Sequence, residues 1–242
     1  MAKLSDMTAS TQLKLLLFGD SGTGKTIFST SLPGKTFVAD FDGKISSAAS
    51  FWKKNNPEQV ELIEYENYQS SGKDDVPAER FNMKMGILAK LNPFPYDTIV
   101  LDSLTLFSDE VAKYIMKTNP GIKRVITNGA QSPCLQDYGI IRLFMKQMLS
   151  SLLSLPCNVI VTAHIQVDKD ENTGELLRTP MMTGKLSREL PIYFSEVWRS
   201  YVDDKGKYLA QTRSDSKYQC RTQLNGIGSP IELNYKEISK WL

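Results

Sequence analysis

The sequence predicts an α/β fold with a mostly parallel central sheet, flanked by helices, and with antiparallel strands at the C-terminal edge of that sheet. Two observations support this prediction. Short apolar runs that fit buried strands alternate with longer segments of helical periodicity, and the best-defined runs end in turns rich in glycine or aspartate. We expect residues 1–242 to form one domain, with residues 1–12 as a flexible N-terminal arm.

The first predicted strand leads directly into a glycine-rich turn. Residues 13–18 are apolar apart from Lys14, and residues 19–26 follow with the sequence GDSGTGKT. This is the complete Gly-x-x-x-x-Gly-Lys-[Ser/Thr] pattern of a P-loop, whose glycines let successive backbone N–H groups point at a phosphate. We expect Lys25 to contact the β- and γ-phosphates and Thr26 to hold Mg²⁺. The whole turn is expected to bind the nucleotide: Gly19, Asp20, Ser21, Gly22, Thr23, Gly24, Lys25 and Thr26.

Composition narrows the class of protein. Hydrophobic residues make up 41% of the chain and charged residues 23%, which are ordinary globular values, so disorder is not expected. The net charge of +2 gives no global field that would indicate nucleic acid. Three widely spaced cysteines predict free thiols in a reducing cytoplasm, and the single histidine means that a zinc site or a Ser-His-Asp triad would depend on His164 alone. No run has the length of a membrane span, so we expect no membrane association.

The remaining elements are predicted from periodicity and from the residues that stop them. We expect strands over residues 36–39, 60–65, 98–102 and 158–162, and further strands within 192–202 and 208–212. Helices are expected over residues 26–32, 46–54, 78–91, 104–116 and 136–155. On the last helix, one apolar stripe is predicted to pack on the sheet: Tyr138, Ile141, Met145, Met148, Leu149 and Leu152.

Aspartates follow two of the predicted strands at the edge where parallel sheets bind ligands. Asp102 ends residues 98–102 as a Walker B aspartate does, which predicts a carboxylate that holds Mg²⁺ through its water shell. The next residue is Ser103 and not the glutamate that activates water in AAA+ proteins, which argues against the AAA+ plan and leaves the base to come from another strand. Asp42, or Asp40, is the candidate that orients or deprotonates the attacking water. The alternative is a polar turn in which these two aspartates cap a helix.

Two polar residues follow the predicted strand over residues 158–162. His164 or Gln166 is expected to face the γ-phosphate and to report whether it is present. The alternative for His164 is an ordinary histidine at the end of a strand.

Basic residues gather in loops and in the closing strands. Residues 117–133 are predicted to be irregular, and residues 167–183 to form a hairpin or a mobile loop around residues 172–174. Four basic residues near the C-terminal end of the sequence are expected to act in trans on the γ-phosphate of a neighbouring subunit or to bind a polyanion: Lys185, Arg213, Lys217 and Arg221. For each of these cations, solvation at the surface is the alternative.

These motifs, in this order, resemble the RecA-like ATPases, and most closely the short phage-encoded RadB-like proteins of single-strand annealing and recombination. The resemblance covers nearly the whole chain and rests on GDSGTGKT at 19–26, FVADFDGK at 37–44, TIVLDSLT at 98–105, QDYG at 136–139 and VIVTAH at 159–164. It implies that Asp42 stands where the family has its catalytic glutamate and that His164 matches the sensor. Aspartate is shorter than glutamate by one methylene group, which predicts slow hydrolysis.

The resemblance also implies a function. We expect an ATPase that uses ATP and Mg²⁺ and binds single-stranded DNA through two loops, residues 117–133 and 165–183. The basic residues of these loops are Lys117, Lys123, Arg124, Lys169 and Arg178. A ring or filament of identical subunits and a single-strand-binding or replication protein are the expected partners, in the cytoplasm of a bacterial host. Two alternatives remain open: a nucleotide-gated assembly or regulatory protein that binds no DNA, and a nucleotide kinase.

Overall fold

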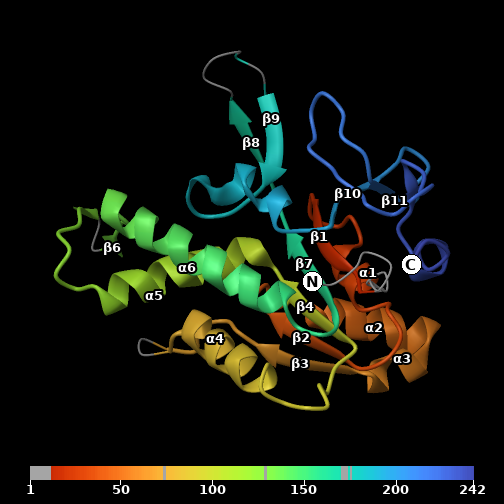
Figure 1. Cartoon of the computed structure of the whole chain (residues 1–242), viewed down its shortest axis with the longest axis horizontal. Coiled ribbons are helices and arrows are strands. Elements are labelled where there is room, and N and C mark those ends of the chain that lie inside the picture. The colour runs from red at the N-terminus through yellow and green to blue at the C-terminus, as the bar shows by residue number, and fades with distance from the viewer. Residues whose placement is uncertain (1–11, 73–74, 128–129, 170–173, 175) are drawn as a thin grey trace, which may run out of the picture.

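Eight strands form one sheet in a computed structural model that describes residues 12–72, 75–127, 130–169, 174 and 176–242 (Figure 1). The strand order is β12–β11–β10–β1–β7–β4–β2–β3, and every pair from β10 to β3 is parallel, whereas β10–β11 and β11–β12 are antiparallel. The strands are β1 (Lys14–Gly19), β2 (Thr36–Asp40), β3 (Ile63–Asn67), β4 (Thr98–Asp102), β7 (Asn158–Ala163), β10 (Glu196–Val202), β11 (Tyr208–Gln211) and β12 (Ile231–Glu232). The predicted fold class is confirmed.

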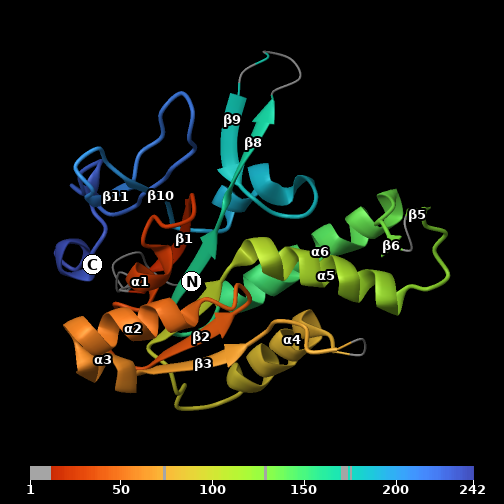
Figure 2. The ribbon, with the colours of Figure 1, turned by 180° about the vertical axis from the view of Figure 1, so that it is seen from behind.

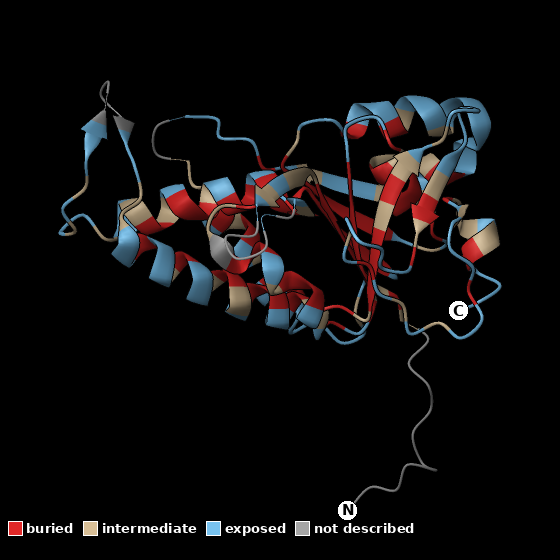
Figure 3. Cartoon of the chain, turned by 90° about the horizontal axis from the view of Figure 1, so that it is seen from above, coloured by how far each residue is buried: buried red, intermediate tan, exposed pale blue. Residues whose placement is uncertain are grey.

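Helices cover both faces of this sheet (Figure 2). One face packs against α4 (Pro77–Leu88), α5 (Leu104–Thr118) and α6 (Leu135–Leu153), and the other against α1 (Lys25–Ser29), α2 (Ile45–Asn55) and α7 (Tyr235–Ile238). Side chains alternate along β1, so that Leu16 and Phe18 join the first core while Leu15 and Leu17 join the second. Both cores are buried along the sheet, and the outer helix surfaces are exposed (Figure 3).

Two short hairpins extend from this body. The first joins β5 (Ile126–Thr127) to β6 (Ala130–Gln131) beyond the ends of α5 and α6, and the second joins β8 (Ile165–Lys169) to β9 (Leu176–Pro180) directly after β7 (Figure 1). The hairpin predicted between residues 167 and 183 is therefore present, although most of its tip lies outside the described residues. Two 3₁₀ helices follow it, η2 (Lys185–Arg188) and η3 (Leu190–Ile192).

Three local predictions need correction, and a fourth falls outside the described residues. Residues 57–61 form helix α3 (Pro57–Glu61), because Pro57 suits a first helical position, and β3 begins only at Ile63. The irregular segment of residues 117–133 contains β5 and β6. On α6 the predicted stripe is buried except for Tyr138, which is 40% exposed. The expected N-terminal arm lies outside the described residues apart from Gln12.

Among the helices that the structure describes, none combines the length and the apolar character needed to cross a membrane.

Candidate nucleotide site

The glycine-rich turn between β1 and α1 has the backbone that its sequence predicts. Gly22 and Gly24 have φ angles of 79° and 83°, a left-handed region that residues with a Cβ avoid. A Cβ at Gly24 would also lie 2.9 Å from Cδ1 of Tyr208, and one at Gly19 would lie 2.2 Å from Oγ of Ser200. The turn is therefore held in place by the closing strands β10 and β11, and it has no room for side chains at Gly19 and Gly24.

Lys25 lies at the start of α1 and folds back over the turn. Its Nζ donates hydrogen bonds to the carbonyl oxygens of Gly19, at 2.8 Å, and Asp20, at 2.7 Å. Burial lowers the pKa of this ammonium group, and the negative charges of Asp102 and Asp42 only partly offset that effect. A buried cation beside backbone N–H groups is suited to an anionic phosphate.

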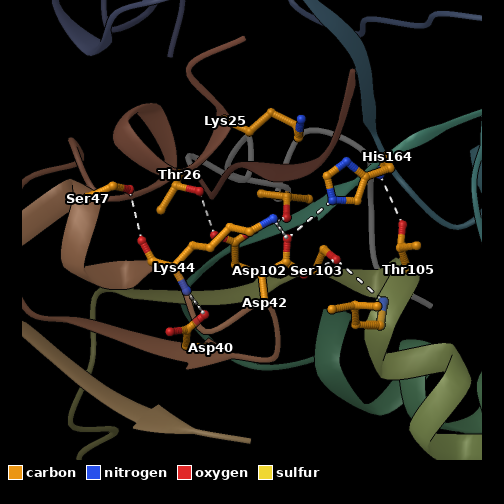
Figure 4. Close-up of polar contacts among 12 residues, drawn as sticks. Lys25, Thr26, Asp40, Asp42, Lys44, Ser47, Asp102, Ser103, Thr105 and His164 are labelled. Carbon is orange, nitrogen blue, oxygen red and sulfur yellow. Dashed lines mark hydrogen bonds and ion pairs between the residues drawn. The ribbon is translucent and has the colours of Figure 1, made fainter. Parts of the chain in front are cut away.

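Thr26 and Asp102 meet where α1 faces the end of β4. The Thr26 hydroxyl donates to Oδ2 of Asp102 at 2.7 Å (Figure 4). Thr162 of β7 donates to Oδ1 of the same carboxylate. Asp102 is 3% exposed, and burial raises its pKa although both hydroxyl groups act in the opposite direction. A hydroxyl and a buried carboxylate side by side are hard oxygen ligands of the kind that Mg²⁺ prefers, so the residues present fit this ion.

The two aspartates after β2 have different environments. Asp40 is 1% exposed, and its carboxylate accepts the backbone N–H groups of Lys44 and Ile45, each at 3.2 Å, at the start of α2. The helix-capping alternative therefore describes Asp40. Asp42 instead faces the P-loop side and accepts a hydrogen bond from Ser103 at 2.6 Å.

His164 lies at the end of β7 and contacts the same carboxylate. Its Nε2 is 3.2 Å from Oδ2 of Asp42, and its backbone N–H donates to Thr105 at 3.0 Å. Burial favours a higher pKa for Asp42, but the hydrogen bonds from His164 and Ser103 outweigh it, and the pKa lies below its usual value. Asp42 is thus held as a carboxylate, which suits it to orient a water molecule more than to remove its proton.

These side chains line one cavity of about 610 Å³. Lys25, Thr26, Asp42, Asp102 and His164, predicted from four separate motifs, all contribute to it, as do all P-loop residues from Ser21 to Thr26. Gly19 and Asp20 are not among its lining residues, although their carbonyl groups hold Lys25.

Sequence reasoning missed the aromatic side chains that line this cavity. Phe51 is 41% and Tyr208 is 51% exposed, and Trp52 packs edge-on against Phe51. These residues come from α2 and β11, which no motif joins. Lys44 was also missed as a site residue, although it stands only two positions after Asp42 in the quoted motif.

Gln166 does not line the cavity. Its side chain donates to Asp168 and to Ser187 at 3.2 Å, and so it ties the base of the β8–β9 hairpin to η2. Of the two candidate sensors, only His164 lies at the site.

Arg124 does not have the exposed position expected of a DNA contact. Its side chain is 2% exposed and forms a two-pronged ion pair with Asp137, whose own side chain is fully buried. This pairing, together with a hydrogen bond from the Cys134 backbone, holds the pKa of Asp137 well below its usual range. Arg124 therefore fixes the chain before α6.

The other predicted cations lie outside the cavity. Lys123, Lys169, Arg213, Lys217 and Arg221 are exposed, and Lys117 lies in the last turn of α5. Arg178 is half-buried, with its guanidinium carbon 5.5 Å from the ring centre of Tyr218. Lys185 begins η2, and its side chain lies outside the described part of the chain. Roles in trans or on a polyanion stay predictions for these residues.

Comparisons with known proteins identify the family of this chain. A family model described as an AAA domain matches residues 11–224. A search of curated proteins found no significant match.

Solved structures that superimpose on the chain include an ATPase from the type III secretion system of pathogenic bacteria and the KaiC-like protein PH0186 from Pyrococcus horikoshii. The first has 9% identity and a TM-score of 0.48, and the match covers 80% of this chain and 51% of that one, so the chain spans about half its length. The second has 13% identity and a TM-score of 0.46, with 90% and 84% coverage. By its family match the chain belongs to the AAA domain family, and it combines a P-loop with a mostly parallel sheet that helices cover on both faces.

Proposed function

We propose that this protein binds ATP with Mg²⁺ and hydrolyses it slowly, and that the bound nucleotide controls its affinity for single-stranded DNA. The observation that carries the ATPase part is the convergence of Lys25, Thr26, Asp42, Asp102 and His164 on one cavity. The exposed aromatic rings of Phe51 and Tyr208 offer flat apolar surfaces to a nucleobase, and the P-loop offers backbone N–H groups and a cation to phosphates.

Each side chain has a distinct role in this proposal. Lys25 exchanges its backbone carbonyl partners for phosphate oxygens, and Thr26 and Asp102 hold Mg²⁺, which neutralises phosphate charge when bound. Asp42 orients the attacking water. His164 and Ser103 fix the Asp42 carboxylate from two sides, so a shift of His164 on loss of the γ-phosphate would also alter the start of β8.

ATP hydrolysis by the purified protein tests the first part. We expect wild-type protein to release phosphate from ATP in the presence of Mg²⁺, and Lys25→Ala and Asp42→Ala to lose this activity. If Asp42→Ala keeps full activity, the assignment of the water-orienting residue is wrong even though the fold is unchanged. Transfer of phosphate from labelled ATP to a nucleoside or nucleotide acceptor, and not to water, would favour the kinase alternative.

The DNA-binding part is supported by the position of the β8–β9 hairpin. It begins directly after His164 and carries Lys169 and Arg178, which can neutralise backbone phosphates. Arg178 lies over Tyr218, and Arg199 lies on the same ring with its guanidinium carbon 3.8 Å from the ring centre. Tyr218, Arg178 and Arg199 are half-buried, so the exposed Lys169 and the charge of Arg178 are what the hairpin offers to a nucleic acid backbone. In this proposal the protein assists annealing, pairing or replication of a phage-type genome, as a ring or filament and beside a single-strand-binding protein.

Fluorescence anisotropy with a labelled oligothymidine tests this second part. Affinity should fall steeply as salt rises, differ between ADP and a non-hydrolysable ATP analogue, and weaken in a Lys169→Ala/Arg178→Ala variant. Lys54→Ala, on the exposed face of α2, serves as the matched control. ATP hydrolysis without any salt-dependent DNA binding would favour the nucleotide-gated regulatory alternative.

A further inference from the structure

A second lysine faces the candidate nucleotide site. Lys44 precedes α2, and its backbone N–H is fixed by the carboxylate of Asp40 at 3.2 Å. Its side chain is 63% exposed and extends toward Asp42, with Nζ 3.9 Å from Oδ2 (Figure 4). Lys44 and Lys25 both line the cavity, one from the turn after β2 and the other from the P-loop.

Asp42 does not need Lys44 as a partner. Its two oxygens already have Ser103 at 2.6 Å and His164 at 3.2 Å, and the contact to Lys44 is at the outer limit of an ion pair. An ion pair with a mostly exposed lysine contributes little to stability. The position of Lys44 is therefore poorly explained by folding alone.

The two lysines bring like charges to one cavity. Two ammonium groups that converge on one space repel each other unless an anion lies between them. A lysine suits such an anion because its ammonium group is a compact charge with three donors on a flexible chain.

We propose that Lys44 is a catalytic residue that contacts the γ-phosphate oxygens of the nucleotide bound by its own chain. This inference rests on the proposed ATPase function and adds a residue that no motif assigns. During hydrolysis the water oxygen bonds to the γ-phosphorus, and the bond from phosphorus to the β–γ bridging oxygen breaks with its electron pair left on ADP. One proton of the water passes to an oxygen of the γ-phosphate, while Asp42 accepts a hydrogen bond from the attacking water and orients it. Lys44 stabilises the negative charge on the γ-phosphate oxygens during this step.

Lys44 reaches the nucleotide site of its own chain because the backbone that carries it is fixed next to that site. Lys44 is two residues from Asp42, and Asp40 holds the backbone between β2 and α2. This cation thus serves the site without a neighbouring subunit, whereas Lys217 and Arg221, which lie outside the cavity, would need one.

Calorimetric titrations with ADP and with the β,γ-imido analogue of ATP, both with Mg²⁺, test the proposal. Lys44→Gln should weaken the triphosphate analogue about tenfold or more relative to ADP, because ADP lacks the phosphate that Lys44 contacts. Lys44→Arg keeps the charge and should restore most of this preference. Lys54→Gln, which alters an exposed lysine of α2 outside the cavity, should match the wild type. In ATP hydrolysis we expect Lys44→Gln to lower kcat by at least about tenfold, with a smaller change in KM.

Mixing experiments separate action within one chain from action between chains. An excess of Lys25→Ala protein, which carries an intact Lys44, should not restore hydrolysis by Lys44→Gln protein. Restoration would overturn the assignment to the same chain, and an unchanged ratio of the two affinities in Lys44→Gln would overturn the contact itself. If wild-type protein binds neither nucleotide, the proposed function fails as well, and that result is distinct from an effect of Lys44.

Discussion

Asp40 and Asp42 are two residues apart, yet exchanging each for asparagine should affect different properties. Asp40 accepts two backbone N–H groups at the start of α2 and is 1% exposed. Asparagine keeps one carbonyl acceptor and turns an NH₂ group toward the second N–H. The lost hydrogen bond costs about 1 kcal/mol and the buried unpaired donor about 1–3 kcal/mol more, so we expect a loss of about 2–4 kcal/mol. For a chain of this size that lowers Tm by roughly 5–15 °C.

Asp42→Asn should leave the free energy of unfolding within about 1 kcal/mol of the wild type, because the amide oxygen still accepts from Ser103 and the amide NH₂ can donate to Nε2 of His164 in its other tautomer. It should lower kcat for ATP hydrolysis by roughly 10²–10⁴-fold, since the charge that orients water is lost. Urea unfolding and steady-state phosphate release measure the two effects on the same preparations. The reasoning is refuted if Asp40→Asn abolishes turnover in folded protein while Asp42→Asn retains it.

The remaining predictions concern the turn and the segment before α6. Gly24→Ala should weaken nucleotide binding, measured by titration, and destabilise the fold, measured by urea unfolding. The positive φ alone should cost about 1–2 kcal/mol, and the close contact of the new Cβ with Tyr208 should add to this loss of stability. Arg124→Ala should lower Tm, and the protein that remains folded should bind DNA as the wild type does. Lys123→Ala should weaken DNA binding and leave Tm unchanged. The reverse pattern would contradict the structural role of Arg124. Since the folded pKa of Asp137 lies below its ordinary value of 3.8, the ion pair should stabilise the protein fully above about pH 4 and lose that contribution as pH falls further. Acid unfolding followed by circular dichroism should therefore show a flatter acid limb in Asp137→Asn.

The sequence predicted the parts of the site that short local patterns specify. A P-loop needs glycine at particular positions, and the ends of parallel strands meet at one edge, so these two rules alone place Lys25, Thr26, Asp102 and His164 together. Asp42 followed from the same rules, and the structure distinguishes it from Asp40 through the backbone N–H groups that cap α2.

Other residues depend on contacts that the sequence does not reveal. From the sequence, Arg124 is expected to be an exposed basic residue of a loop. In the structure it forms a buried ion pair with Asp137, which lies thirteen positions later in the chain. Gln166 has the right place in the chain but turns toward Ser187. Tyr208 reaches the P-loop only because β11 folds back beside β10, which is a property of the whole sheet.

The central claim is that the cavity between the P-loop and the end of β2 binds a magnesium-bound nucleotide. Calorimetric titration of wild-type protein with the β,γ-imido analogue of ATP tests it most directly, with and without Mg²⁺. We predict one site per chain, weaker binding after Mg²⁺ is removed, and loss of binding in Lys25→Ala. Absence of binding by folded wild-type protein, or binding that Lys25→Ala leaves unchanged, would contradict the claim.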